Sequence, residues 1–393
     1  MSSLSLSERV SLLTIAREWG RIGVTGFGGP PVHIALLRRL CVDKHEWMDA
    51  SEFEDGIAAT NMLPGPASTQ LAIFCAWRLR GPVGGLIGGL CFIVPGLVLI
   101  VLLSALFLEV DPPLWILAAA AGAGAAVPAI AVSAGAGLVA GSWKRTGTDR
   151  GPRVRWVVYV AVGLAAGATV GAYLVFVLVA LGVIEIGFRR DWRKGPPQAS
   201  LLLVPLPVLG PIVGVGGALA LAWVALKVGA LSYGGGFVII PLMQHDAVVS
   251  YHWMTNAQFL NAVALGQVTP GPVVLTVAAV GFAAAGVGGA LLATLIAFAP
   301  SFVFVFAGGR HFDRLRQNAS VQAFLTGAGA TVIGAIIGSA IPLGLALSQL
   351  WQLGVLVGAL AWLLLFRRGV VTAILIAAAL GVGAVLLGAP LGH

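Results

Sequence analysis

A Pro-Gly-Pro segment inside apolar sequence carries the first residues that could do chemistry. Leu63-Pro64-Gly65-Pro66 is followed directly by the polar residues Ser68, Thr69 and Gln70. Proline and glycine interrupt the hydrogen-bond ladder of a helix. The helix that restarts after such a break presents free N–H groups and the positive end of its dipole. The segment therefore predicts a binding site for a small anion.

The same break occurs a second time, and a glycine-rich break precedes each copy. Thr269-Pro270-Gly271-Pro272 repeats the first segment, while Gly26-Phe27-Gly28-Gly29-Pro30 and Tyr233-Gly234-Gly235-Gly236 are the glycine-rich breaks. Broken backbone in lipid is tolerated only where protein or a water-filled cavity satisfies it. Paired interruptions in two halves are typical of the midplane site of a transporter. The alternative, in which Pro-Gly-Pro only kinks a helix for packing, would not require both breaks to recur together.

Two cations precede the glycine-rich breaks at equivalent positions. Arg21 and Lys227 are each flanked by apolar residues on an expected helix. A cation inside the membrane costs about 2.5–3.5 kcal/mol on insertion scales, so it usually marks a pathway or a paired partner. We expect the two to form a cationic pair at the substrate site. In the alternative they are anchors whose side chains extend to the interface.

Further polar residues near the breaks complete the candidate site. His33 lies three residues past Gly-Gly-Pro and could face the anion, while Glu52 and Asp55 are candidates for carrying a coupling proton. The alternative for these carboxylates is a solvated helix start with Ser51 as its N-cap. The candidate substrate-binding residues are Arg21, Phe27, Gly28, Gly29, His33, Asn61, Pro64, Gly65, Pro66, Ser68, Thr69, Gln70, Lys227, Tyr233, Gly234, Gly235, Gln267, Thr269 and Gly271.

Enzyme and metal motifs are absent from the sequence. There is no phosphate-binding GxxxxGK[ST] and no HExxH, because His45-Glu46 is followed by Trp47-Met48-Asp49. The three cysteines have no CxxC spacing and predict free thiols or packing residues. We expect no catalytic residue, no metal and no cofactor.

The composition predicts that lipid is the solvent for the elements that position these residues. Of 393 residues, 59% are hydrophobic and only 10% are charged, too few charges to cover a water-soluble fold of this size. About 20 apolar residues span a bilayer. Stretches of this kind run over Val83–Phe107, Leu114–Ala140, Trp156–Phe188, Gly286–Phe306, Val321–Leu347 and Trp351–Leu387. We predict an all-α polytopic membrane protein with broken or re-entrant helices and roughly ten crossings.

The formal net charge of +8 does not predict nucleic-acid binding. The basic residues form short clusters between apolar runs, as in loops that are retained in the cytoplasm. These clusters are Arg38, Arg39 and Lys44; Lys144, Arg145, Arg150, Arg153 and Arg155; and Arg189, Arg190, Arg193 and Lys194. The N-terminal residues Met1–Val10 lack the apolar core of a removable signal peptide.

The chain repeats itself at an offset of 206 residues (227 − 21). Trp47-Met48 meets Trp253-Met254 in the same register that aligns the Pro-Gly-Pro segments. The basic loop with Arg38 and Lys44 corresponds to residues 244–255, which hold no Lys or Arg. Equivalent loops then lie on opposite faces, which indicates an inverted-topology repeat. Two parallel repeats with chance placement of charge are the alternative.

The inverted topology sets the domain boundary. It requires the connector to cross the membrane once, for which Leu201–Val224 is sufficiently apolar. We divide the chain into a first transporter repeat, residues 1–199, and a second, residues 200–393, which begins with this connector.

These motifs resemble the chromate ion transporter family in its long form with two homologous domains. The residues that carry the resemblance are Gly26-Phe27-Gly28-Gly29-Pro30 with His33, Trp47, Glu52-Phe53, Asp55, Asn61, Leu63-Pro64-Gly65-Pro66 and Ser68-Thr69-Gln70, with a looser match over Ser232–Gly236 and Gln267–Pro272. The resemblance implies efflux of chromate that confers resistance, with sulfate as a competing or counter-transported anion. His33 and Asp55 have Ile239 and Asn261 as second-half equivalents, so any role for them belongs to the first half.

The expected setting is a multi-pass protein of the cell inner membrane, with the lipid bilayer and chromate or sulfate as partners, and with a homodimer left open. A sulfate or other small-oxyanion transporter, a passive anion channel and, with less support, a membrane-embedded enzyme are the rival functions.

Overall fold

The computed structural model describes residues 10–61, 63, 65–108, 113–170, 173–189, 217–232, 237, 239–308 and 318–391, and every regular element in these ranges is helical. The helices before residue 200 are α1 (Leu12–Thr25), α2 (Pro30–Arg38) with the π-helical turn η1 (Arg39–Lys44), α3 (Ala50–Thr60), α4 (Ala67–Leu108), α5 (Leu114–Ala125), α6 (Val127–Lys144), α7 (Arg150–Thr169) and α8 (Leu174–Arg189). Those after it are α9 (Ala218–Leu231), α10 (Ile239–Gln244) with η4 (His245–Ser250), α11 (Asn256–Val268), η5 (Val273–Leu275), α12 (Thr276–Gly308), α14 (Ala319–Leu345), α15 (Leu350–Leu360) with η6 (Ala361–Leu365), and α16 (Val370–Leu386).

Elements recur along the chain at the offset found in the sequence. Helices α1 and α9 begin at Leu12 and Ala218, which are 206 residues apart (218 − 12). The π-helical turns η1 and η4 begin at Arg39 and His245, again 206 apart (245 − 39). Matching sequence therefore produces matching local structure on both sides of residue 200.

Helix α4 is a hairpin of two arms. Its backbone leaves the helical region at Arg80 and Gly81, where φ of Gly81 is 64°. The arms then pack so closely that a Cβ on Gly84 would come within 2.5 Å of the carbonyl oxygen of Ala76. Helix α12 turns in the same way at Gly286, with φ of 58°. The apolar stretches expected from Val83 and Gly286 are the second arms of these hairpins.

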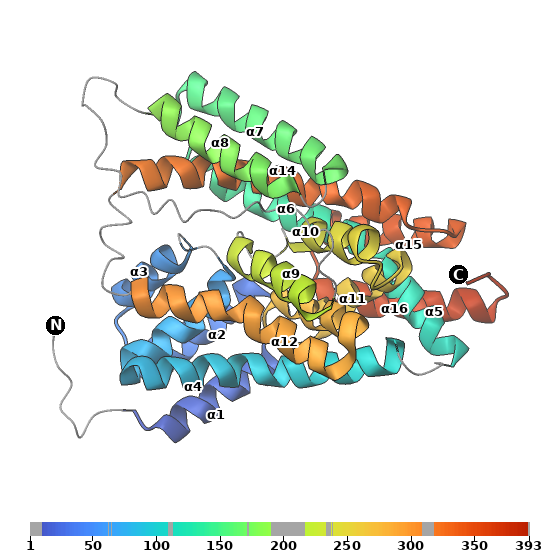
Figure 1. The fold of residues 1–393 in the computed structure, drawn as a ribbon, viewed down its shortest axis with the longest axis horizontal. Helices are drawn as coiled ribbons and strands as arrows, with labels where there is room; N and C mark the ends of the chain where they lie inside the picture. Colours follow the sequence, from blue (N-terminus) through green and yellow to red (C-terminus); the bar gives the residue numbers. More distant parts are fainter. Residues whose placement is uncertain are drawn as a thin grey trace.

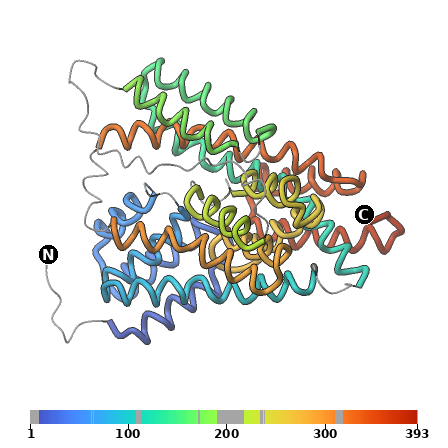
Figure 2. The backbone as a smooth tube through the Cα atoms, viewed as in Figure 1, coloured from blue at the N-terminus to red at the C-terminus, as the bar shows by residue number. Residues whose placement is uncertain are grey.

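The hairpins lie at the centre of one group of helices, and a second group packs beside it (Figure 1). Helix α4 packs against α1 and α12, and α12 packs against α9. In the second group α14 packs against α6, α7 and α8. Helices α5 and α16 pack against each other and share the core of the first group. Helices from both sides of residue 200 are thus combined in each group, as the colours along the backbone in Figure 2 make visible.

Four described helical segments are long and apolar enough to cross a membrane: Ala67–Phe107, Leu114–Lys144, Val273–Gly308 and Ala319–Leu345. Shorter apolar helices cover Ala218–Leu231, Leu350–Leu365 and Val370–Leu386. The stretch expected over Trp156–Phe188 is divided between α7 and α8. The protein is a polytopic, all-helical membrane protein. Residues 201–216, the first part of the expected connector, lie outside the described residues.

The outer surface of α4 is apolar at the spacing of a helix face. Large hydrophobic side chains are exposed along its second arm at Leu86, Leu90, Val94, Val98, Leu102 and Leu106. They recur every four residues, so each lies beside the next in a row that winds slowly around the helix. A continuous stripe of this kind would be unfavourable in water, and we assign it to contact with lipid. The three cysteines form no disulfide.

Candidate functional site

The first break separates α1 from α2 and is held together by a buried histidine. Gly28 and Gly29 have φ of 105° and 76°, a region that favours glycine. His33 is fully buried, with Nε2 2.9 Å from the carbonyl oxygen of Gly26 and Nδ1 3.2 Å from Oγ of Ser68. The carbonyl can only accept, so Nε2 donates, and in the neutral ring Nδ1 accepts from the Ser68 hydroxyl. His33 thus joins the two breaks of the first half.

The second break separates α3 from α4 and presents the N-terminus of α4. Gly65 is buried with φ of 119°, and a Cβ there would lie 2.5 Å from Nε2 of Gln70. The N–H groups of Thr69 and Gln70 donate to the Pro66 carbonyl oxygen at 3.0 Å. The earlier N–H groups of a helix have no acceptor within the helix. They lie in this break together with Ser68, Thr69 and Gln70, whose side chains are buried.

A pocket of about 290 Å³ lies directly beside this break. The first half contributes Asn61, Leu63, Gly65 and Ala67 to its wall; α6 and its C-cap contribute Gly137, Leu138, Gly141, Ser142 and Arg145; and α14 contributes Gly329, Val332 and Ile333. A single water needs about 10–15 Å³ by this kind of measure, so the pocket has room for a tetrahedral dianion with hydrating water. The polar side chains in its wall are those of Asn61, Ser142 and Arg145.

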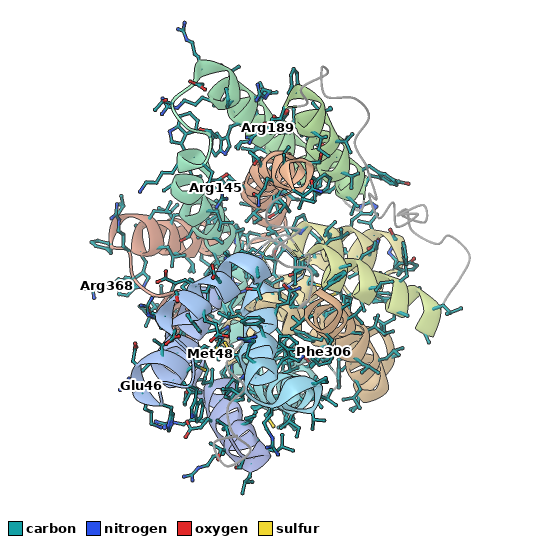
Figure 3. The ribbon with its side chains drawn as sticks, turned by 90° about the vertical axis from the view of Figure 1, so that its left-hand side faces the viewer. Glu46, Met48, Arg145, Arg189, Phe306 and Arg368 are labelled. Carbon is teal, nitrogen blue, oxygen red and sulfur yellow. The ribbon has the colours of Figure 1, made fainter. Side chains whose placement is uncertain are left out.

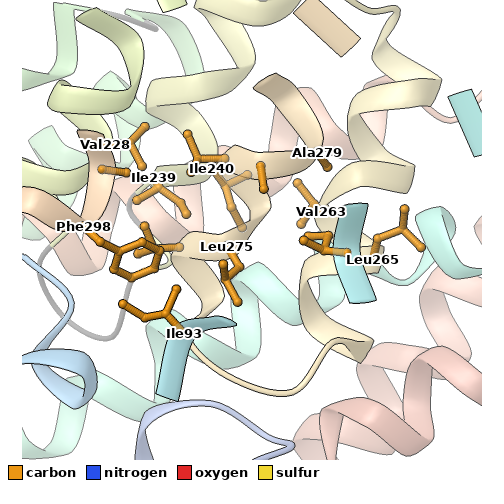
Figure 4. Close-up of a cluster of buried hydrophobic side chains, with 14 of the residues drawn as sticks. Ile93, Val228, Ile239, Ile240, Val263, Leu265, Leu275, Ala279 and Phe298 are labelled. Carbon is orange, nitrogen blue, oxygen red and sulfur yellow. The ribbon is translucent and has the colours of Figure 1, made fainter. Parts of the chain in front are cut away.

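The Pro-Gly-Pro turn of the second half makes different contacts from that of the first half. The N–H of Gly271 donates to the carbonyl oxygen of Gly26 at 3.1 Å, so the second turn is tied to the first break. The residues that follow it, Val273, Val274 and Leu275, are buried and apolar. Figure 4 shows Leu275 within a cluster of apolar side chains from several helices, including Ile239 at the position equivalent to His33. The second turn therefore has apolar Val274 and Leu275 at the positions equivalent to Ser68 and Thr69.

The two other polar residues expected at the second turn are buried. The hydroxyl of Thr269 donates to the carbonyl oxygen of Leu265 at 2.7 Å within α11. Gln267 is 7% exposed, and no described group bonds its Nε2 atom. The Thr269 hydroxyl is therefore used within its own helix, whereas the Nε2 atom of Gln267 has no partner among the described groups.

The two expected cations have different surroundings. Arg21 is exposed on α1. Lys227 is 2% exposed on α9, and its Nζ lies 2.5 Å from Oδ2 of the fully buried Asp246. The charge of Lys227 is therefore already neutralised within the protein. Asp246 was not identified from the sequence, although a single acidic residue in an apolar segment, where the first half has Leu40, could have signalled it.

The two candidate coupling carboxylates also differ. Glu52 is partly buried and forms an ion pair with Arg78 on α4, while Asp55 is exposed on α3. The neighbouring Glu54 pairs with Arg38 at 3.4 Å. Of the three, Glu52 is the one whose side chain is partly buried.

The remaining candidates lie at the edge of the site or outside the described residues. Phe27 is 41% exposed beside the first break. Pro64, Tyr233, Gly234 and Gly235 lie outside the described residues. No cluster of His, Cys, Asp or Glu with the geometry of a metal site occurs in the described part of the chain.

The structure brings together residues whose relation is not visible in the sequence. Arg145 lines the same pocket as Gly65, although the sequence pattern placed it only in a cytoplasmic loop. Ser301 is buried on α12, and its Oγ lies 3.4 Å from the position a Cβ on Gly65 would occupy. Neither Arg145 nor Ser301 could be assigned to the site from the sequence, because each lies far along the chain from the break at Gly65.

A family model described as Chromate transporter matches this chain over residues 13–186 and 219–383. The match falls in two segments that together cover most of the chain, one on each side of residue 200.

Curated relatives are similar over most of their own length. A chromate transport protein of Cupriavidus metallidurans is 28% identical over 82% of this chain and 80% of its own. A chromate transport protein of Pseudomonas aeruginosa is 30% identical over 80% of this chain and 77% of its own. An uncharacterized transporter of Methanocaldococcus jannaschii is 26% identical over 91% and 90% of the two chains. No solved structure matches this chain.

Proposed function

This chain belongs to the chromate transporter family in its long, two-domain form, and from that premise we propose that it exports chromate across the cell inner membrane and confers chromate resistance. Sulfate is a second substrate of the same site, because both anions are tetrahedral and carry two charges. The chain is a membrane transporter rather than an enzyme.

The observation that supports the proposal is the pocket beside Gly65. The N-terminus of α4 lies at this pocket with Ala67 in its wall, and the dipole of a helix favours negative charge at that end. Asn61 adds an amide at the same pocket. Backbone and amide donors around a cavity with room for water are suited to an oxyanion that keeps part of its hydration.

The residues of the first half carry the binding of the anion in this proposal. Ser68, Thr69 and Gln70 supply polar groups after the first Pro-Gly-Pro turn, whereas the second turn is followed by buried apolar side chains. Gln267 and Gly271 act from the second half, Gly271 by holding Gly26. Asp55, whose side chain is exposed on α3, is assigned the coupling role in this proposal.

The two halves form an inverted repeat in this proposal. Its support is the recurrence of α1 as α9 and of η1 as η4 at one offset, together with the opposite charge of equivalent loops. Roughly ten crossings are part of this proposal, and the four long segments, the three shorter apolar helices, α7 and α8 supply nine apolar segments in the described part of the chain.

The membrane potential favours export. One elementary charge moved through 100 mV is worth about 2.3 kcal/mol, so a dianion gains about twice that when it leaves an interior that is negative. No further energy source is needed for outward movement at equal concentrations.

The decisive measurement is flux of labelled chromate and sulfate in proteoliposomes with an imposed potential. We expect flux of both anions, with stimulation by anion on the opposite side. Flux without such stimulation would identify a passive channel instead. Vesicles that move neither anion, although they contain folded protein, would refute the proposal.

A further inference from the structure

A dianion that enters this protein needs a fixed positive charge, and the structure limits which residue supplies it. Removing even one charge from water costs several kcal/mol in a protein interior, more than a helix end alone offsets. Lys227 is held by Asp246, and Arg21 is exposed on α1 outside the pocket wall. Neither expected cation therefore faces the pocket beside Gly65 as a free charge.

Arg145 is the cation in the wall of that pocket. It is the C-cap of α6 and is exposed, and none of the carboxylates in the described part of the chain forms an ion pair with it. Two other arginines of the same basic segment are engaged: Arg153 stacks over Trp143, and Arg155 binds Glu185 at 2.8 Å. In Figure 3, Arg145 lies between the green helices and the blue helices of the first half.

A hydroxyl donor lies one turn before Arg145 in the same wall. Ser142 is 5% exposed, and its Oγ accepts a hydrogen bond of 2.9 Å from Nε1 of Trp156. Because the indole can only donate, the proton of the Ser142 hydroxyl is available for another acceptor. An oxyanion in the pocket provides one.

The space in front of these groups is kept open by glycines. Gly137 and Gly141 line the pocket from α6, and a Cβ built on either would meet no atom within 4 Å. A larger side chain at either position would enter the pocket, so glycine leaves this space open.

We infer that Arg145, with Ser142, forms the cationic half of the oxyanion site, opposite the Gly65 turn. The planar guanidinium presents paired donors that match two oxygens of a tetrahedral anion, which the point charge of a lysine does not. Arg145 thereby sets the preference for dianions over monovalent anions. This inference rests on the proposed function, since it assigns a residue to the same site.

The test compares Arg145→Gln, Arg145→Lys and the matched control Lys144→Gln in proteoliposomes at equal protein content. Lys144→Gln removes the same charge from the adjacent residue, which does not line the pocket. Half-saturating concentrations of chromate and of nitrate are measured, and binding of chromate to detergent-solubilised protein is followed by equilibrium dialysis. A charge-assisted contact predicts that Arg145→Gln weakens chromate binding by about tenfold or more. Arg145→Lys should retain an intermediate affinity, and Lys144→Gln should equal the unchanged protein.

A second pair of variants tests the pocket without removing charge. Gly141→Leu fills the space in front of Ser142, while Gly187→Leu places the same side chain on the exposed surface of α8, where a Cβ also meets nothing within 4 Å. We expect loss of chromate flux and binding only in Gly141→Leu. Equal affinity in Arg145→Gln and Lys144→Gln, or full flux in Gly141→Leu, would overturn the inference. Absence of flux in the unchanged protein and in Lys144→Gln would instead refute the proposed function.

Discussion

The backbone N–H of Gly271 donates a hydrogen bond of 3.1 Å to the carbonyl oxygen of Gly26. Gly26 is also the acceptor for Nε2 of His33, at 2.9 Å. One carbonyl group therefore joins the Pro-Gly-Pro turn of the second half to the buried histidine of the first. The geometry of the first break depends on residues more than 200 positions apart. A change that breaks the hydrogen bond from Gly271 should therefore also alter the one from His33.

Substitutions of His33 and Ser68 should have non-additive effects, because the two side chains are hydrogen-bonded to each other. His33→Ala leaves the buried carbonyl of Gly26 and the hydroxyl of Ser68 without this partner, a cost of about 1–3 kcal/mol for each unsatisfied group. We expect lower thermal stability in detergent and strongly reduced flux. In a double-mutant cycle with Ser68→Ala, the second change should cost less in the His33→Ala background. Strictly additive effects would contradict the link.

The conformation of Gly65 should be required for transport. With φ of 119°, the position disfavours any side chain, and a Cβ would also crowd Gln70. Gly65→Ala should abolish flux while the protein still inserts. Gly81→Ala is the control, because it introduces backbone strain at φ of 64° where a Cβ meets no atom within 4 Å. Flux and the amount of folded protein in the membrane are measured for both variants. Normal flux in Gly65→Ala would show that the turn only bends the chain and is not required for transport.

We expect the ion pair of Lys227 with Asp246 to stabilise the fold. Removing one partner leaves a buried charge uncompensated, which costs about 3–5 kcal/mol. Lys227→Met and Asp246→Leu should each lower the midpoint of thermal unfolding sharply, and the double variant should recover most of the loss. Arg21→Gln should leave stability nearly unchanged. If the double variant is folded but transports no chromate, the pair has a role in transport beyond stability.

The inverted repeat predicts that equivalent turns lie on opposite sides of the membrane. Asp43 in η1 and Val249 in η4 are 206 residues apart (249 − 43), and both are exposed. Single cysteines at these positions, in a background without the native thiols, should react with an impermeant reagent from opposite faces of oriented vesicles. Reaction of both from the same face would instead support parallel repeats.

Local chemistry, readable in the sequence by itself, determined the membrane-spanning helices and the positions of their breaks. Apolar length predicted the helices, because about 20 such residues are needed to cross a bilayer. Glycine and proline located the breaks, since their effect on the backbone is felt at their own positions. Gly65 and Gly271 were found in this way, and both have the positive φ that only glycine adopts readily.

Tertiary packing decided which side chains meet at those breaks. Arg145 lies 80 residues after Gly65 in the chain (145 − 65) yet shares its pocket, because α6 and α14, which pack against each other, line the pocket together with the break between α3 and α4. Lys227 has the sequence pattern of a free cation, but Asp246 lies 2.5 Å from it in the folded protein. The residue type alone gives the charge of a side chain. Whether that charge is paired within the protein or can bind a ligand depends on contacts between helices that are distant in the sequence.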